Sequence, residues 1–422
     1  ALSSAASDVY KRQEEDIMKK FNKVLSVVVA SAMVMAMAGC GNTDNGSAAT
    51  GTNAATESAA ADNGAASGSV FKIGGIGPTT GGAAVYGLAV QHGAEIAVEE
   101  INAAGGINGY QVEFKFQDDE ADAEKSVNAY NALKDWGAQV LDGSTTSGAC
   151  IAVTDKTKED NMFQITPSGS AVECVQYDNN FRVCFSDPNQ GLASAQYIGE
   201  NGLAEKIAVI YDSSDVYSSG IYEKFVKEAE NQPFEVVAAE AFTADNKTDF
   251  SVQLQKAKDA GADMVFLPIY YQESALILTQ AAAMGYAPKW FSCDGMDGIL
   301  GGVDNFDVSL TEGVMLLTPF AADATDDLTQ SFVTKYKEKY GETPNQFAAD
   351  SYDAIYVIKA AIEKSGVTPD MSVSDICDGM KAAMTEITVD GLTGNGMTWT
   401  ADGEANKAPK AVVIENGAYK AM

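Results

Sequence analysis

The sequence predicts an α/β fold made of two lobes, each built on a doubly wound parallel sheet. Short apolar, strand-like runs alternate with helical segments along most of the chain, which is the pattern of parallel sheets with helices on both faces. The folded body, from about Val70 to Met422, is too long for one hydrophobic core of typical size. These two observations favour two α/β lobes over one.

Three segments of different composition precede this body. Residues 1–17 place acidic side chains directly before a positive segment. Their stretch DVYKRQ also back-translates to what looks like a sequencing-adapter fragment. We therefore interpret residues 1–17 as a non-native leader. Residues 18–39 have a positive start, an apolar core of about 15 residues and a small-residue end, which predicts a secretion signal, because a bilayer span needs ~20 residues. Residues 40–69 are small and polar, and we expect a flexible tether that reaches roughly 30 Å.

The signal ends in AMAGC, which resembles the lipobox of bacterial lipoproteins. The resemblance implies that the chain is cut before Cys40 and that this cysteine carries the lipid. The alternative is an ordinary signal peptide that is cleaved nearby, with Cys40 incidental. We expect an extracytoplasmic protein that is attached to the cell membrane through its lipid alone.

The body contains seven strand-like runs and four clear helical segments. The runs are FKIGGIG (71–77), QVEFKF (111–116), AQVLDG (138–143), MFQITP (162–167), KIAVIYD (206–212), DMVFLP (263–268) and WFSCD (290–294). The helical segments are 87–104, 122–136, 217–231 and 272–285. Gly105 and Gly106 follow the first helix, as expected at a helix C-terminus.

The charge of the chain excludes one class of partner. The formal net charge is −31, from 28 basic and 59 acidic residues. Binding of nucleic-acid phosphates needs clusters of lysine and arginine. The body has a single arginine, Arg182, for which we expect a structural role in a strand.

The sequence offers little support for an enzyme. Its one histidine, His92, falls away from the apolar stripe of its helix, so we expect an exposed side chain without a catalytic role. Zinc sites built on histidine need at least two histidines. The glycine-rich stretch IGGIGPTTGG lacks the G-x-G-x-x-G spacing of a dinucleotide loop. We therefore predict a protein that is not an enzyme and has no cofactor and no metal.

The body has five cysteines: 150, 174, 184, 293 and 377. In an exported protein Cys174 and Cys184 could form a disulfide across a short loop. All five could equally remain reduced, because pairing does not follow from a sequence.

Hydroxyls, aromatic rings and one carboxylate follow the predicted strands. Ligands of open parallel sheets bind just beyond the carboxyl ends of the strands. Serine and threonine are also common in turns and helix caps, which is the alternative explanation for any one of these residues. Their conjunction at one edge favours a ligand site. The residues are Tyr86, Ser147, Ser168, Ser170, Tyr217, Tyr270 and Asp294.

Several stretches resemble the branched-chain amino-acid binding proteins, which have the type I periplasmic-binding-protein fold and supply ABC transporters. They are YGLAVQHGAEIAVEEINAAGGINGYQVEF, DDEADAEKSVNAYNAL, ITPSGSA and AVIYDSSDVYSSG. The resemblance implies two lobes joined by three crossing strands, near Phe185, Thr318 and Gly394. Lobe 1 would then comprise 70–185 and 319–392, and lobe 2 would comprise 186–318 and 393–422.

The resemblance also implies ligand roles, residue by residue. The family's serine after the third strand falls on Ser147, and the two polar positions of its T-P-x-x-[ST] turn fall on Ser168 and Ser170. Its cleft-facing tyrosines fall on Tyr86, Tyr217 and Tyr270. The acid that pairs with the ligand ammonium, a glutamate in aliphatic-specific members, falls on Asp294, which is one methylene shorter.

The expected function is capture of a neutral amino acid, aliphatic first, by a monomer that closes around it and delivers it to an ABC transporter permease. Two alternatives stay open. The same fold could act as a ligand-sensing subunit that docks on a signalling receptor. It could also bind a small amide or urea-like solute.

Overall fold

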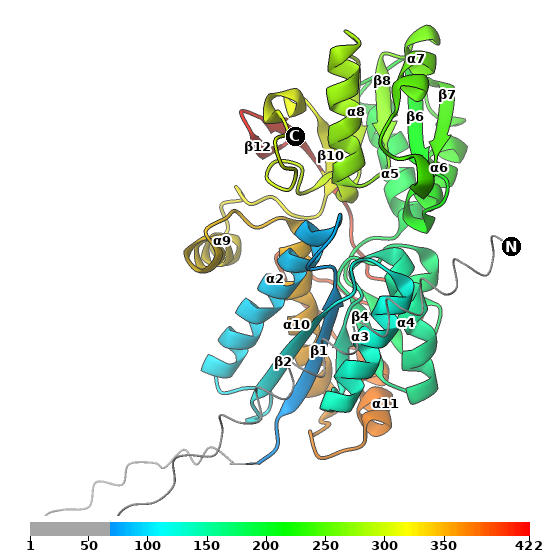
Figure 1. Ribbon diagram of the computed structural model, residues 1–422. Helices are drawn as coiled ribbons and strands as arrows, with labels where there is room; N and C mark the ends of the chain where they lie inside the picture. Colours follow the sequence, from blue (N-terminus) through cyan, green and yellow to red (C-terminus); the bar gives the residue numbers. More distant parts are fainter. Residues whose placement is uncertain (1–67) are drawn as a thin grey trace, which may run out of the picture. The chain divides into compact units, whose positions relative to one another are not determined.

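The computed structural model describes residues 68–422 (Figure 1). The predicted leader, the signal peptide, Cys40 and nearly all of the tether lie outside the described residues. Within the described part, no helix is both long enough and apolar enough to cross a membrane.

The first sheet has five parallel strands in the order β2-β1-β3-β4-β5. The strands are β1 (Phe71–Gly77), β2 (Val112–Asp118), β3 (Val140–Asp142), β4 (Phe163–Thr166) and β5 (Asn180–Arg182). Helices α2 (Ala84–Ala103) and α10 (Gln346–Ser365) pack together on one face, and α3 (Ala123–Trp136) and α4 (Ser147–Asp160) pack on the other (Figure 1). Helix α9 (Asp327–Tyr340) contacts α2, and helix α11 (Val373–Met384) contacts α10.

The second sheet has seven strands in the order β12-β11-β10-β9-β8-β6-β7. They are β6 (Lys206–Asp212), β7 (Glu235–Phe242), β8 (Met264–Leu267), β9 (Lys289–Ser292), β10 (Met315–Thr318), β11 (Lys410–Glu415) and β12 (Ala418–Ala421). Its helices are α5 (Asp187–Glu200), α6 (Val216–Ala229), α7 (Ser251–Asp259) and α8 (Tyr271–Ala283). Helices α5 and α6 cover one face, with Ile207 and Phe266 of the sheet buried against them.

The α/β class and the two sheets confirm the predicted fold. All seven predicted strands and all four predicted helices are present, with ends that differ by a few residues. The second sheet also has an antiparallel edge, because β11 pairs antiparallel with β10 and with β12. The two-residue turn at Asn416 and Gly417 has positive φ at both positions, 53° and 72°, which suits a tight hairpin.

The chain crosses between the two sheets three times, and the predicted lobe boundaries stay a prediction. Helices α9 to α11 return to the first sheet after β10, and β11 and β12 then join the second sheet. Between α11 and β11 the chain contacts β5. Trp399 Nε1 donates to the Arg182 carbonyl at 2.8 Å, and the Arg182 amide donates to the Gly403 carbonyl at 3.0 Å.

A buried ion pair connects these crossing segments. Lys407 Nζ lies 2.6 Å from Asp350 Oδ1, and the two side chains are 1% and 2% exposed. The same ammonium donates to the Val183 carbonyl at 3.1 Å and to Thr393 Oγ1 at 2.5 Å. Three segments far apart in sequence thus meet at one buried cation beside α10.

Two glycines allow pairs of helices to approach closely, one pair on each sheet. A Cβ atom at Gly93 of α2 would lie 2.0 Å from the carbonyl oxygen of Ala348 in α10. A Cβ atom at Gly191 of α5 would lie 2.4 Å from the carbonyl oxygen of Ile221 in α6. Neither contact leaves room for a side chain.

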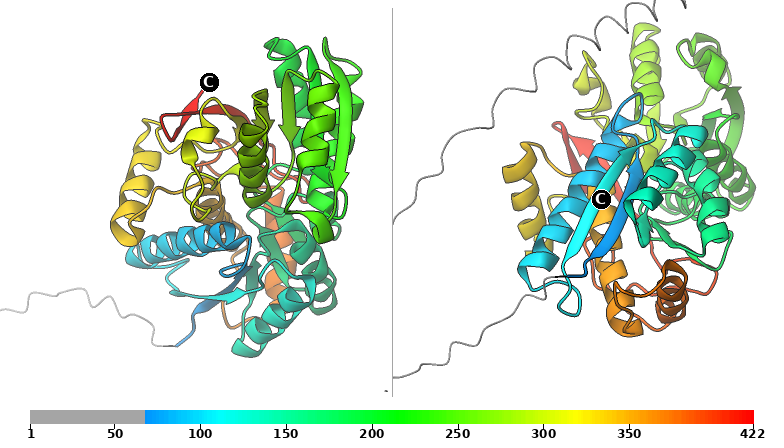
Figure 2. Two further views of the ribbon diagram at one scale, coloured as in Figure 1. Left: turned by 45° about the horizontal axis from the view of Figure 1, so that its top comes forward. Right: turned by 60° about the horizontal axis from the view of Figure 1, so that its bottom comes forward.

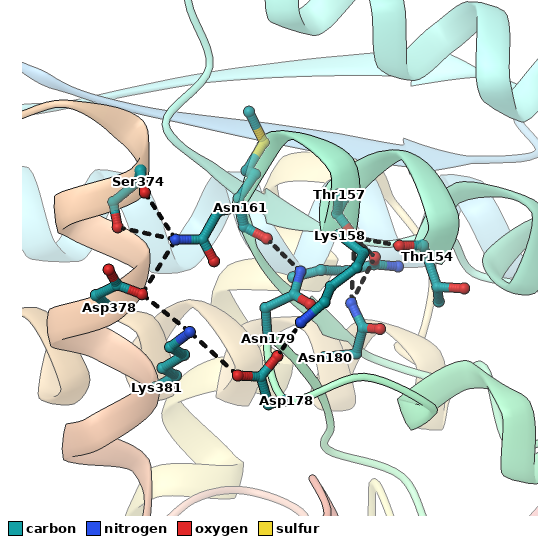
Figure 3. Close-up of polar contacts among 12 residues, drawn as sticks. Thr154, Thr157, Lys158, Asn161, Asp178, Asn179, Asn180, Ser374, Asp378 and Lys381 are labelled. Carbon is teal, nitrogen blue, oxygen red and sulfur yellow. Dashed lines mark hydrogen bonds and ion pairs between the residues drawn. The ribbon is translucent and has the colours of Figure 1, made fainter.

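A surface network fastens α11 to the end of α4 and to the loop before β5 (Figure 3). Asp178 accepts from Lys158 at 2.5 Å and from Lys381 at 3.1 Å. Asn161 Nδ2 donates to Ser374 Oγ at 2.8 Å and to Asp378 Oδ1 at 3.0 Å. These groups are largely exposed, so each ion pair contributes little, about 0–1 kcal/mol.

The expectation that His92 is exposed was wrong. Its ring stacks on Tyr340 with centroids 3.7 Å apart, and its Nδ1 lies 3.2 Å from the hydroxyl of Tyr336. Both tyrosines belong to α9, which the sequence reading did not place against this face of α2. Burial lowers the pKa of His92, which fits a neutral packing role.

Candidate ligand-binding site

The seven predicted site residues meet at one cavity between the first sheet and the second. The cavity is narrow: about 20 Å³ is open to the centre of a water-sized sphere, which is room for about one water molecule. Thr145, Thr146, Gly295 and Phe347 complete its lining and were not predicted. The predicted residues on its wall are Tyr86, Ser147, Ser168, Ser170, Tyr217, Tyr270 and Asp294.

One wall carries hydrogen-bond donors. Ser147 is the first residue of α4, so its backbone N–H is free of intrahelical bonds, and the helix dipole favours an anion there. Its hydroxyl oxygen accepts from the amides of Ser170 and Ala171, both at 3.1 Å. Because that oxygen already accepts twice, its own proton is available to a ligand. Ser168 donates from its hydroxyl to the Thr145 carbonyl at 2.6 Å.

Arg182 holds this wall in place from behind. Its guanidinium is fully buried and donates to the carbonyls of Ser170 at 2.5 Å and Ala171 at 2.9 Å. Glu404 lies 3.4 Å from its Nε. The single arginine of the body therefore fixes the loop that carries Ser168 and Ser170.

The opposite wall carries the acid. Asp294 follows β9 and starts a short 3₁₀ turn, Asp294–Met296. Its Oδ1 accepts from the Tyr217 hydroxyl at 2.7 Å, and that hydroxyl accepts from the Gly295 amide at 2.9 Å. Asp294 is 4% exposed, and burial raises its pKa to about 7. An unpaired carboxylate in this position is costly, so a cation beside it would be stabilised.

Aromatic rings form the remaining side of the cavity. The Tyr86 ring lies 4.4 Å from that of Phe347 and 5.5 Å from that of Tyr270, measured between centroids. The Tyr86 hydroxyl donates to the Gly295 carbonyl and accepts from the Tyr271 amide at 3.1 Å. Tyr86 thus reaches from α2 to the second lobe, and the two walls are in contact.

A second buried acid lies behind the donor wall, and the sequence reading missed it. Asp187 is 1% exposed and neither of its carboxylate oxygens has a hydrogen-bond partner. Its amide donates to the Ser170 carbonyl at 2.9 Å. Burial raises the pKa of Asp187 well above its ordinary value. The sequence SDPN reads as an ordinary helix start, so only the three-dimensional position marks this residue.

The disulfide considered between Cys174 and Cys184 is not formed. All five described cysteines are free and buried. Cys174 Sγ lies 3.7 Å from the Ser147 carbonyl, whereas Cys184 Sγ lies 3.6 Å from the Gly169 carbonyl. Each thiol is thus directed at a different carbonyl, and burial raises the pKa of both thiols well above the ordinary value.

The arrangement suits binding of a molecule with separated charges. Donors from one lobe face an acid from the other across a small cavity, and aromatic rings offer an apolar contact. Among residues 68–422 no group of three or more His, Cys, Asp or Glu side chains is placed to hold a metal ion.

A family model described as periplasmic binding protein matches residues 70–418. The "Leu/Ile/Val-binding protein homolog 3" of Brucella melitensis is 31% identical over 300 residues, which cover 71% of this chain and 80% of that protein. The "Leucine-, isoleucine-, valine-, threonine-, and alanine-binding protein" of Pseudomonas aeruginosa is 30% identical over 303 residues, which cover 70% of this chain and 79% of that protein.

Solved structures agree with these sequence relatives. The substrate-binding protein LivJ of a branched-chain amino acid transporter from Streptococcus pneumoniae, in complex with isoleucine, superposes with a TM-score of 0.75 at 29% identity. That match covers 83% of this chain and 98% of the other. The leucine-binding protein LivK from Thermotoga maritima superposes with a TM-score of 0.74 at 28% identity, and covers 84% and 98% of the two chains.

Proposed function

This chain belongs to the periplasmic binding protein family, and we propose that it binds a neutral, aliphatic amino acid between its lobes and delivers it to an ABC transporter permease. The observation that carries the proposal is the cavity with donors on one wall and a buried acid on the other. The names of the relatives reported above, which refer to binding of leucine, isoleucine and valine, support an aliphatic ligand.

The carboxylate of the amino acid would lie against the donor wall. The hydroxyls of Ser147 and Ser170 donate to it, together with the free amides at the start of α4. Arg182 is occupied with backbone carbonyls, so it does not offer a bidentate site for a second carboxylate. This supports a ligand with a neutral side chain.

The ammonium of the amino acid would lie against Asp294. The carboxylate supplies a charge-assisted hydrogen bond, and the Ser168 carbonyl and the Ser170 hydroxyl add neutral acceptors. Tyr217 keeps one carboxylate oxygen oriented through its 2.7 Å hydrogen bond. The ammonium thereby relieves the cost of burying the acid.

The side chain would contact Tyr86, Tyr270 and Phe347. The apolar faces of these rings support an aliphatic side chain. Because ligand groups contact both lobes, the ligand favours the closed arrangement, and the closed surface is what a permease would recognise.

The first test replaces the acid. We expect Asp294→Ala to weaken binding of leucine, isoleucine or valine by ~2–5 kcal/mol, because it leaves a buried ammonium unpaired. Isothermal titration calorimetry measures the change, with the exposed Asp304→Ala as a matched control in the same lobe. Near-unchanged affinity in Asp294→Ala would refute the pose.

We also propose that Cys40 carries the lipid that attaches the protein to the outside of the cell membrane. The AMAGC sequence and the family's extracytoplasmic location support this assignment. In cells that export the full chain, Cys40→Ser is expected to move the protein from the membrane fraction to the soluble fraction. Retention of the serine variant in the membrane fraction would exclude lipidation at this cysteine.

A further inference from the structure

One segment of the second lobe lies directly on two helices of the first. Residues 295–302 follow β9 and contact the first turns of α2 and α10. In the left view of Figure 2, α2, in blue, lies between the strands of the first sheet and the yellow loops that follow β9. A hinge motion that separates the lobes must break the contacts of the 295–302 segment with these helices.

The first contact is made by Val85, the second residue of α2. Each of its methyl groups packs on one glycine of the 295–302 segment. A Cβ atom at Gly298 would lie 2.6 Å from Val85 Cγ1, and a Cβ atom at Gly302 would lie 2.6 Å from Val85 Cγ2. Val85 is not among the residues that line the amino-acid cavity. A ligand in that cavity therefore leaves this contact in place.

The second contact is made by the hydroxyl of Tyr86, the next residue of α2. The hydroxyl donates to the Gly295 carbonyl and accepts from the Tyr271 amide at 3.1 Å. Tyr271 is the first residue of α8, so its amide has no acceptor within that helix. The Tyr86 ring lines the amino-acid cavity, whereas its hydroxyl is bonded to the backbone of the second lobe.

The third contact is made at the start of α10. The amide of Gln346, the first residue of that helix, donates to Asp297 Oδ2 at 2.8 Å. A carboxylate is favourable at a helix N-terminus. On the other side of the segment, the Tyr419 hydroxyl of β12 accepts from the Gly298 amide at 3.2 Å. The segment is thus held to its own sheet while it contacts the other lobe.

We propose that these three contacts hold the lobes closed and thereby set the rate at which a bound amino acid is released. Val85 and the Tyr86 hydroxyl are positioning groups, because they act through closure of the lobes. The release of an amino acid rests on the function proposed above, whereas the closure contacts do not. Opening of a closed site limits release in many binding sites and enzymes.

Amide hydrogen exchange tests the closure contacts without a ligand. The amides of Tyr271 and Gln346 each donate to a partner in the other lobe, so their exchange reports opening of the contacts. In the full chain with Val85→Ala, both amides should exchange about tenfold faster, because the burial of two methyl groups is lost. Val252→Ala is the matched control, since Val252 is also the second residue of its helix, α7, and is 62% exposed. It should leave both exchange rates unchanged.

Stopped-flow measurements of ligand release test the functional consequence. Val85→Ala should speed the release of leucine, isoleucine and valine by the same factor, because closure changes and the cavity does not. Tyr86→Phe keeps the ring, lacks the hydroxyl and should change exchange and release in the same direction.

Three results would overturn the proposal. They are unchanged exchange of the two amides in Val85→Ala, unchanged release in that variant, and release factors that differ between the three amino acids. If the unaltered chain binds none of the three amino acids, the function proposed above fails, and hydrogen exchange alone decides whether the contacts hold the lobes closed.

Discussion

At the scale of single residues, burial sets the chemistry of the site. Asp294 is held by Tyr217, yet burial outweighs that hydrogen bond and raises its pKa to about 7. Burial also raises the pKa of Asp187, which lies behind the donor wall. A cation beside Asp294 would therefore be stabilised, because it would compensate the cost of burying that carboxylate.

This burial predicts a pH dependence of amino-acid binding. A ligand ammonium favours the ionised form of Asp294, so binding lowers the pKa of that group from about 7 and releases a proton wherever the free protein still holds it. Affinity should be constant above about pH 8 and weaken by up to about tenfold per pH unit between about pH 7 and 5.

Calorimetry in buffers of different ionisation enthalpy would count the released proton. The pH dependence of the affinity should disappear in the Asp294→Asn variant. A variant at the exposed Asp304, Asp304→Asn, should retain it. An affinity that stays constant from pH 5 to pH 8 would contradict this assignment.

At the scale of elements, the strands and helices were predictable where local pattern decides them. The seven strand runs were found because each is a short apolar run between turns. The antiparallel β11–β12 hairpin was not predicted, although the Asn-Gly pair at 416–417 is a strong hairpin signal.

The residues that follow the strands at the cleft were predictable for a related reason. The residues that packing brings to the site from elsewhere were not. Parallel strands place their carboxyl ends at one edge, so the polar residues that follow them line one cavity. Phe347 on α10 follows no strand, and Asp187 begins α5 right after a predicted crossing. Their positions depend on long-range packing, as does the contact of His92 with α9.

The close helix pairs give a prediction at this scale. Gly191→Ala should destabilise the protein by about 1–3 kcal/mol, because its Cβ would lie 2.4 Å from the Ile221 carbonyl and 2.9 Å from the Phe225 amide. Gly148→Ala in α4 is the control, since nothing lies within 4 Å of its Cβ, and its stability should be unchanged or up to about 1 kcal/mol higher. Urea unfolding curves with unchanged slopes measure both. Equal stability of the two variants would mean that α5 and α6 can move apart freely.

At the scale of the whole molecule, one buried cation joins segments from both ends of the body. Lys407 contacts Asp350 of α10, Thr393 and the Val183 carbonyl, and the last two residues lie next to predicted crossings. Asp350 is buried, and burial raises its pKa to about 6 despite the ammonium. The buried Asp350 carboxylate therefore needs the Lys407 ammonium to compensate its charge.

Removing the Lys407 ammonium should lower the stability of the protein strongly. Lys407→Met leaves the Asp350 carboxylate buried without its partner and should lower the free energy of unfolding by about 3–5 kcal/mol. Lys420→Met breaks an exposed pair with Glu415, whose side chains are 47% and 50% exposed, and should cost no more than about 1 kcal/mol. Chemical denaturation at pH 7.5 compares the two. A cost for Lys407→Met no larger than that for Lys420→Met would show that the crossings are held by other contacts.

The order of the elements along the chain also bears on biosynthesis. The first sheet is made of residues 71–182, but α10 covers one of its faces from residues 346–365. The second sheet gains its last two strands only from residues 410–421. A chain that leaves the ribosome from its N-terminus thus keeps an uncovered apolar face and an open strand edge until its last residues emerge. Such a chain stays incompletely folded throughout synthesis, which is the state that a narrow export channel can thread.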